Sequence, residues 1–321
     1  GGSGGGGDAA RNTEVASMAM IETRNLTKHY GDEQAVQGID LTVEEGSIHG
    51  FVGPNGAGKS TTMGMLVGNI TPTVGEATIG GDPAGTHAAR ERIGFAPQDP
   101  VFYDSMTADQ YLKYIGTVAG VEGSVAERVD ELLEWLSLAD ASNQPIGGYS
   151  GGMKRRLNLA QAMINDPDLL ILDEPTAELD PQGRSAIIDA LQRLTDEGKT
   201  VFVSSHILAE LEQFIETVTV INDGQLLMTG PLEEVWESVE TAYIVESTDD
   251  ERLAELLATH EAVSRTEPAD DGGLTVWTDD PEAFATALPT MVSEAGLGLY
   301  GVERAGGLEE AFLEMIDGEE E

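Results

Sequence analysis

The sequence has no cysteine, few basic residues and few aromatic residues among its 321 positions. Without cysteine, the chain has neither disulfides nor thiolate ligands for a metal. It contains no run of about 18 apolar residues, which argues against a transmembrane helix, and no signal peptide is evident. Asp and Glu total 58 against 17 Lys and Arg, so the net charge is −41. Such a charge repels the nucleic-acid backbone, and we expect no nucleic-acid partner.

The acidic residues are spread along the whole chain rather than gathered in one tail. This distribution favours a halophilic protein over a disordered acidic segment. At about 1 M salt the Debye length is roughly 3 Å, so surface charges hardly repel one another. We therefore expect the thermal stability to rise with KCl concentration up to the molar range.

A glycine-rich stretch carries the most specific chemical signal in the chain. It reads Gly53-Pro54-Asn55-Gly56-Ala57-Gly58-Lys59-Ser60-Thr61 and fits the pattern G-x-x-x-x-G-K-[ST]. The apolar residues 47–52 before it read as a buried strand, and residues 62–67 after it follow a helical pattern. Glycines let backbone N–H groups point at phosphate oxygens, and the helix N-terminus adds partial positive charge. This predicts a phosphate-binding loop in which Lys59 contacts the β- and γ-phosphates and Ser60 binds Mg²⁺.

Strands and helices alternate around this loop, which indicates an α/β core with a largely parallel sheet and covering helices. The further expected strands are 20–26, 35–43, 76–79, 93–98, 168–173 and 200–205. Residues 183–197 predict an amphipathic helix, and the apolar spacing over 107–164 predicts a helical insertion.

A second pattern begins near residue 240. Strands are expected at 243–246, 261–266, 274–278 and 297–302, with helices at 249–258 and 280–295. This order, βαββαβ, predicts a small α+β domain of the ferredoxin-like type, closed by a helix at 308–316. The predicted organisation is a flexible leader at 1–19, a first domain at 20–238 with a helical subdomain at about 99–164, and a C-terminal domain at 240–318. The natural start of the chain is expected near Met18-Ala19-Met20.

Further polar residues stand at the ends of predicted elements. Asp173 ends an apolar strand, where a carboxylate can hold Mg²⁺, and Glu174 follows it, where it can polarise an attacking water. Ser150-Gly151-Gly152 begins a helix and forms a second anion-binding end. Gln98 and His206 each end a strand. Taken singly, each also fits an ordinary role as an acidic turn, a helix cap or a polar strand end.

Together these motifs resemble the ATP-binding cassette (ABC) ATPase family over roughly residues 20–235. The resemblance makes 53–61 the Walker A loop, 169–174 the Walker B strand, 150–154 the signature motif and 177–180 the D-loop. It implies that Tyr30 stacks on adenine, Gln98 is the Q-loop glutamine and His206 is the switch histidine. The implied catalytic residues are Lys59, Gln98, Glu174 and His206. The implied nucleotide contacts are residues 53–61 with Tyr30, Ser150, Gly151, Gly152 and Asp180. The implied Mg²⁺ ligands are Ser60, Gln98 and Asp173.

The resemblance also implies a fold and partners. The fold would be a P-loop NTPase with a RecA-like core, a helical subdomain and an antiparallel β portion. Two copies would pair head to tail, with each ATP held between Lys59 of one copy and Ser150 of the other. Separate permease subunits at the inner face of the cell membrane would contact the segment 99–103. Residues 153–156, Met-Lys-Arg-Arg, are similar to the branch that exports drugs, lipids or polysaccharides.

Two positions depart from the family pattern. Tyr149 and Met153 flank the serine and glycines where Leu and Gln are frequent, and Glu178 stands where a small residue is common. The second departure would weaken communication across a dimer. Two other functions stay open: a soluble ABC ATPase acting outside transport, and a regulatory subunit that binds nucleotide but hydrolyses it slowly. The C-terminal domain would bind a regulator, stabilise the dimer or cap it, and nothing in its sequence favours one of these roles. The sequence does not indicate the transported substrate, which the membrane subunit would recognise.

Overall fold

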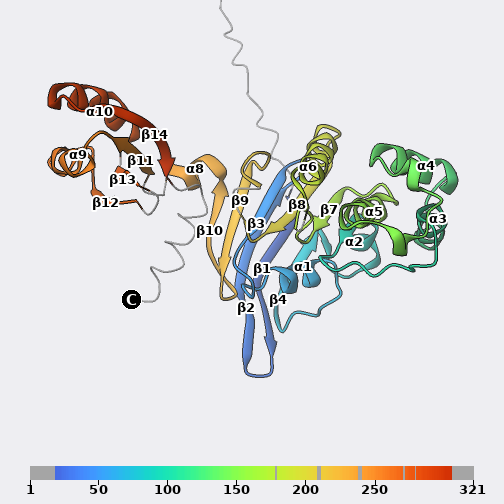
Figure 1. The fold of residues 1–321 in the computed structure, drawn as a ribbon. Coiled ribbons are helices and arrows are strands. Elements are labelled where there is room, and N and C mark those ends of the chain that lie inside the picture. Colours follow the sequence, from blue (N-terminus) through green and yellow to red (C-terminus); the bar gives the residue numbers. More distant parts are fainter. Residues whose placement is uncertain are drawn as a thin grey trace, which may run out of the picture.

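The computed structural model describes residues 19–177, 179–207, 211–237, 241–269, 272–278 and 280–305. Residues 1–18 of the leader predicted at 1–19, Glu178 and the predicted closing helix 308–316 lie outside the described residues. Ala19 was assigned to the leader but is the first residue of a strand. The described elements form three sheets with helices packed against them (Figure 1). No helix within the described residues is long and apolar enough to cross a membrane.

A six-stranded sheet forms the centre of the molecule, in the order β10-β9-β3-β8-β7-β6. Its strands are β3 (Ile48–Val52), β6 (Ile93–Ala96), β7 (Leu169–Leu172), β8 (Thr200–Ser205), β9 (Thr217–Asn222) and β10 (Gln225–Pro231). All neighbours pair in parallel except β9 and β10. Every residue of β3, β7 and β8 is buried, as expected for parallel strands covered on both faces. The residues that follow β3, β7 and β8 therefore meet at one edge of the sheet.

An antiparallel sheet packs on one side of this core, in the order β2-β1-β4-β5. Its strands are β1 (Ala19–Tyr30), β2 (Glu33–Glu44), β4 (Val74–Ile79) and β5 (Asp82–Pro83). Helix α1 (Lys59–Leu66) shares a hydrophobic core with both sheets, through Met63 and Leu66 from the helix, Ile21 from β1 and Phe51 from β3. The phosphate loop before α1 is thus held between the two sheets.

The helical insertion lies on one flank of the central sheet (Figure 1). It contains α3 (Ala108–Ala119), α4 (Val125–Trp135) and α5 (Gly151–Met163), with short 3₁₀ turns at Ala139–Ala141 and Ile146–Gly148. Thr107 begins α3 with a capping box that includes Gln110. Within the described residues, this part also contains α2 (His87–Glu91), α6 (Pro181–Asp196) and α8 (Leu232–Glu237).

The C-terminal elements form a separate four-stranded sheet with its own hydrophobic core. They run β11 (Thr241–Ser247), α9 (Asp250–Leu257), β12 (Arg265–Pro268), β13 (Leu274–Thr278), α10 (Pro281–Ala295) and β14 (Leu299–Ala305). The strand order is β12-β13-β11-β14 and all three pairings are antiparallel. This element order is the predicted βαββαβ pattern; the predicted domain boundaries stay predictions.

Several expectations about strands differ from the structure. The strand expected at 261–266 is β12, which overlaps that range only at residues 265 and 266. The strand predicted at 93–98 ends at Ala96, because Pro97 has no N–H to donate to a neighbouring strand. Gln98 therefore stands two residues beyond the strand, in a loop. The strands β5, β9 and β10 were not expected, and β9 and β10 complete one side of the central sheet.

Candidate active site

The phosphate loop between β3 and α1 adopts a conformation that only glycine fits. Gly56 and Gly58 have φ values of +92° and +99°, a region that side chains with Cβ rarely enter. A Cβ on Gly58 would lie 2.5 Å from the Ala35 carbonyl oxygen, and one on Gly53 would lie 2.4 Å from the Ile221 carbonyl oxygen. No side chain caps the N-terminus of α1 and its first turn holds no acid, so its N–H groups suit an anion.

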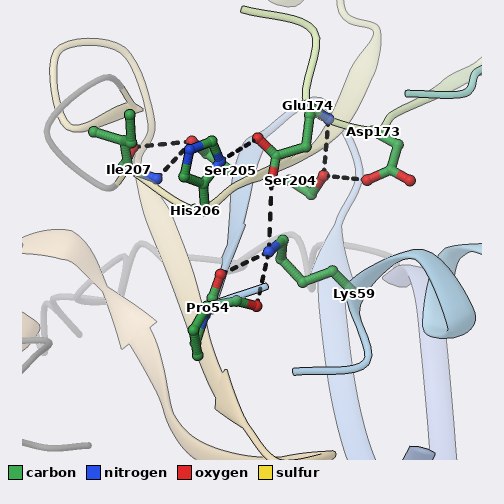
Figure 2. Close-up of polar contacts among 9 residues, drawn as sticks. Pro54, Lys59, Asp173, Glu174, Ser204, Ser205, His206 and Ile207 are labelled. Atoms are coloured by element: carbon green, nitrogen blue, oxygen red, sulfur yellow. Dashed lines mark hydrogen bonds and ion pairs between the residues drawn. The ribbon is translucent and has the colours of Figure 1, made fainter. Parts of the chain in front are cut away.

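Lys59 is buried and folds back over the loop that carries it. Its Nζ donates to the carbonyl oxygen of Gly53 at 2.6 Å and to that of Pro54 at 3.2 Å. The same ammonium lies 3.4 Å from Glu174 Oε1 (Figure 2). Burial lowers the pKa of Lys59 from its ordinary value, and the Glu174 carboxylate partly opposes that shift. The ammonium is thus stabilised by these three oxygens.

Glu174 is buried and is the centre of a chain of polar contacts at the sheet edge, which ends on the exposed His206. Its Oε2 lies 2.7 Å from Nδ1 of His206, while its Oε1 faces Lys59. Its backbone is left-handed, with φ +52°, and its N–H donates to Ser204 Oγ at 3.0 Å. The Ser204 hydroxyl in turn donates to Asp173 Oδ1 at 2.7 Å. Figure 2 shows these contacts joining the ends of β7 and β8 above the phosphate loop.

Ser204 is a site residue that the sequence interpretation missed. It is fully buried and fixes both Asp173 and the backbone of Glu174. Its signal in the sequence was a hydroxyl within the strand Thr200–Ser205, two residues before His206. That signal is weak, because buried serines often bond only to backbone.

A cleft of about 310 Å³ lies along the phosphate loop. Its lining contains predicted nucleotide contacts from the loop together with Tyr30 and Gln98, and adds Glu33 and Ala35, which were not predicted. The lining residues are Tyr30, Glu33, Ala35, Asn55, Gly56, Gly58, Lys59, Ser60, Thr61, Gln98 and Glu174. The cleft therefore runs from the tip of the β1–β2 hairpin to the carboxylate of Glu174.

Several predicted residues adjoin this cleft without lining it. Gly53 and Pro54 contact Lys59 through their carbonyl oxygens, and Ala57 is buried within the loop. Asp173 reaches the site through Ser204, and His206 reaches it through Glu174. The structure thus places these predicted residues next to the residues that line the cleft.

Four predicted nucleotide contacts lie elsewhere in this chain. Ser150 is the exposed N-cap of α5, where its side chain accepts a hydrogen bond from the Met153 N–H at 3.2 Å, and Gly151 and Gly152 follow it. Asp180 is the exposed N-cap of α6 and accepts from the Gly183 N–H at 2.8 Å. None of these four residues lines the cleft of its own chain.

The predicted metal ligands are all oxygen donors. Asp173 offers a buried carboxylate, Ser60 an exposed hydroxyl and Gln98 an exposed side-chain amide. Mg²⁺ prefers such ligands and usually completes its shell with water and substrate phosphates. The donor set therefore fits Mg²⁺ bound together with a nucleotide.

Comparison with known proteins agrees with this geometry. Residues 36–177 match the family model described as ABC transporter. Nod factor export ATP-binding protein I of Burkholderia lata is 34% identical over 303 residues, which cover 93% of this chain and 97% of that protein. Linearmycin resistance ATP-binding protein LnrL of Bacillus subtilis is 37% identical over 214 residues, 66% of this chain and 69% of that protein.

Comparison with solved structures also finds ATP-binding cassettes. A dimeric ATP-binding cassette in a post-hydrolysis state, bound to ADP and phosphate, matches with a TM-score of 0.61 and 26% identity. The match covers 66% of this chain and 99% of that one. A second dimeric structure, of a bacterial ABC transporter cassette, matches with a TM-score of 0.61 and 29% identity, over 66% of this chain and 99% of that one. The chain therefore belongs to the ABC transporter family, as an ATP-binding subunit that hydrolyses ATP.

Proposed function

We propose that this subunit powers export through separate membrane permease subunits, at the inner face of the cell membrane. The observation that carries the proposal is the chain of contacts at the end of the cleft, which runs from buried Lys59 through buried Glu174 to the exposed His206. Relatives named for Nod factor export and for linearmycin resistance support the export direction.

The cleft suits a triphosphate nucleotide in one orientation. The phosphates would lie in the loop 53–61, where backbone N–H groups and the start of α1 favour negative charge. The base would stack on Tyr30, which lines the opposite end of the cleft. Ser60, Asp173 and Gln98 would hold Mg²⁺, which supplies charge neutralisation at the phosphates when bound.

Glu174 is the residue that would polarise the attacking water. Its two oxygens face Lys59 and His206 in this structure. Phosphate oxygens in the loop would compete for the Lys59 ammonium, since charge-assisted contacts to phosphate are strong. That competition would free Oε1 for a water molecule, while His206 keeps the carboxylate oriented.

A second copy of the chain would complete the site. Ser150, Gly151 and Gly152 are at the exposed N-terminus of α5 and do not line their own cleft. In a head-to-tail pair they would cover the γ-phosphate of the other copy, so that this phosphate joins the two chains. The dimeric cassettes among the structural relatives support this arrangement.

Exposed apolar residues on the helical insertion would contact the permease. The exposed fractions are 90% for Val101, 58% for Tyr103, 49% for Tyr114 and 71% for Val118. The rings of Tyr103 and Tyr114 are in contact, with centroids 6.2 Å apart. The net charge of the chain is −41, so a group of exposed apolar side chains is unusual on its surface. Such a group is typical of a site that binds another protein.

The Glu174→Gln variant tests the catalytic assignment. It should bind ATP yet lose turnover by about 10²- to 10⁴-fold, the usual cost of removing one oriented general base. Glu131→Gln, an exposed position on α4, is the matched control and should keep full activity. Phosphate release measured in molar KCl checks both variants. Undiminished turnover in Glu174→Gln would remove Glu174 from the role.

The transport assignment needs a separate measurement. The subunit should copurify with a coexpressed multi-span permease, and replacing Val101 and Tyr103 by serine should abolish that association. Val302→Ser removes an apolar residue that is 44% exposed on β14 and should leave the association unchanged. Equal association for both variants would reject the proposed contact surface.

A further inference from the structure

We propose that Lys28 is a positioning residue for the nucleotide base, acting through the ring of Tyr30. The inference rests on the proposed role of Tyr30 as the stacking partner of the base. Lys28 belongs to none of the motifs identified in the sequence. Its position in the structure is what assigns it this role.

The two side chains lie on the same side of β1. They are two residues apart on one strand, and strand side chains alternate with a period of two. The ammonium of Lys28 lies 5.1 Å from the centroid of the Tyr30 ring, within the distance of about 6 Å at which a cation and a ring attract. Tyr30 lines the cleft and Lys28 does not. The cation therefore contacts the ring from outside the cleft lining, and the proposal places the base on the opposite face of the ring.

The ammonium is held in this place by backbone as well. Lys28 Nζ donates to the carbonyl oxygen of Thr71 at 2.8 Å, in the loop that follows α1. The adjoining backbone is joined to the same loop, because Thr73 N–H donates to Thr27 O at 2.8 Å and the N–H of His29 donates to Thr73 Oγ1 at 3.0 Å. Lys28 thus connects the ring to the segment that leaves the phosphate-binding helix.

The charge has a direct consequence for stacking. A cation on one face draws the electron density of the ring toward itself, so the opposite face becomes less negative. An electron-rich purine then stacks on that face with less repulsion. The cation also restrains the ring, which is 48% exposed at the tip of the hairpin. Both effects favour the binding of the base and leave the phosphate contacts unchanged.

The test compares ATP with inorganic tripolyphosphate, which has the phosphates but no base. Dissociation constants for both are measured with wild type, Lys28→Met, Lys28→Arg, Tyr30→Ala and the Lys28→Met/Tyr30→Ala double variant, all in one KCl buffer. Met keeps the length of the side chain without its charge, and Arg keeps the charge. Lys113→Met, which removes a lysine paired with Asp109 on α3, controls for the change in net charge.

Lys28→Met should weaken ATP binding two- to five-fold, which is about 0.4 to 1 kcal/mol at 1.4 kcal/mol per tenfold. Tripolyphosphate binding should not change, Lys28→Arg should retain ATP affinity, and the Met substitution should have no further effect in the Tyr30→Ala background. Equal weakening of both ligands, or the same loss without Tyr30, would overturn the inference. If Tyr30→Ala itself leaves ATP binding unchanged, the proposed stacking role fails instead.

Discussion

Replacing Ser204 with alanine should lower both stability and turnover, and the hydrogen bonds of its side chain allow the size of the loss to be estimated. The hydroxyl is fully buried, donates to Asp173 Oδ1 at 2.7 Å and accepts from the Glu174 N–H at 3.0 Å. A hydrogen bond to a charged group contributes about 1.5–3 kcal/mol, and a buried polar group left without a partner costs about 1–3 kcal/mol. We therefore expect the free energy of unfolding to fall by about 2–4 kcal/mol.

The effect on catalysis follows from the backbone of Glu174. Its φ of +52° is unfavourable for a residue with a side chain, and such a conformation persists only where its surroundings impose it. Loss of the Ser204 contact would let the carboxylate move away from the reacting position. A misplacement of roughly 1 Å can cost about 10²-fold in rate, so kcat should fall by up to that factor while KM for ATP changes little.

Ser247→Ala is the matched control for this experiment. The Ser247 hydroxyl also donates to an aspartate, Asp250 Oδ1, at 2.7 Å, and it is also buried. It lies in the C-terminal sheet, so its loss should reduce stability and leave kcat unchanged. Chemical denaturation and steady-state phosphate release measure the two quantities. Wild-type kcat in Ser204→Ala, or an equal loss of kcat in Ser247→Ala, would refute the reasoning.

Three further predictions concern stability. Burial lowers the pKa of His49 to about 3, so the unfolded chain binds a proton more readily than the folded chain below the ordinary pKa of histidine. Between pH 7 and pH 4.5 the wild type should therefore lose roughly 2–3 kcal/mol of unfolding free energy relative to His49→Gln. An equal pH dependence in the two proteins would contradict this. Gly94→Ala should cost about 1–3 kcal/mol, because its Cβ would lie 2.1 Å from the Ala162 carbonyl oxygen, whereas Gly148→Ala meets nothing within 4 Å and should be nearly neutral by calorimetry. The melting temperature should rise steeply with KCl up to the molar range, given the net charge of −41, and a melting temperature indifferent to salt would exclude halophilic adaptation.

The sequence was most informative where chemistry requires a fixed order of residues. The loop 53–61 could be predicted because few other sequences place Gly58, Lys59 and Ser60 between a strand and a helix. The apolar run before Asp173 likewise predicted a central strand, β7, that is buried throughout. In both cases the local residue pattern alone was enough to predict the element, because the position of the element in the fold agrees with that pattern.

Contacts between distant residues could not be predicted in the same way. The Lys59–Glu174 ion pair joins positions 115 residues apart in sequence, counted as 174 − 59. Ser204 and Lys28 depend on how β8 meets β7 and how the β1–β2 hairpin meets the loop after α1. These relations are set by packing, and no residue spacing encodes them. Ser150 and Asp180 are exposed N-caps that do not line the cleft of their own chain. The structure of one chain cannot test their proposed contacts, because these would be made with another copy of the chain.

The most direct test of the account is the molar mass of Glu174→Gln with nucleotide, measured by light scattering in molar KCl with magnesium. ATP should convert the variant from the 34.0 kDa of one chain to twice that mass, and ADP should not. A single-chain mass at saturating ATP, or no measurable affinity for ATP, would contradict the central claim that the nucleotide joins two copies of this chain.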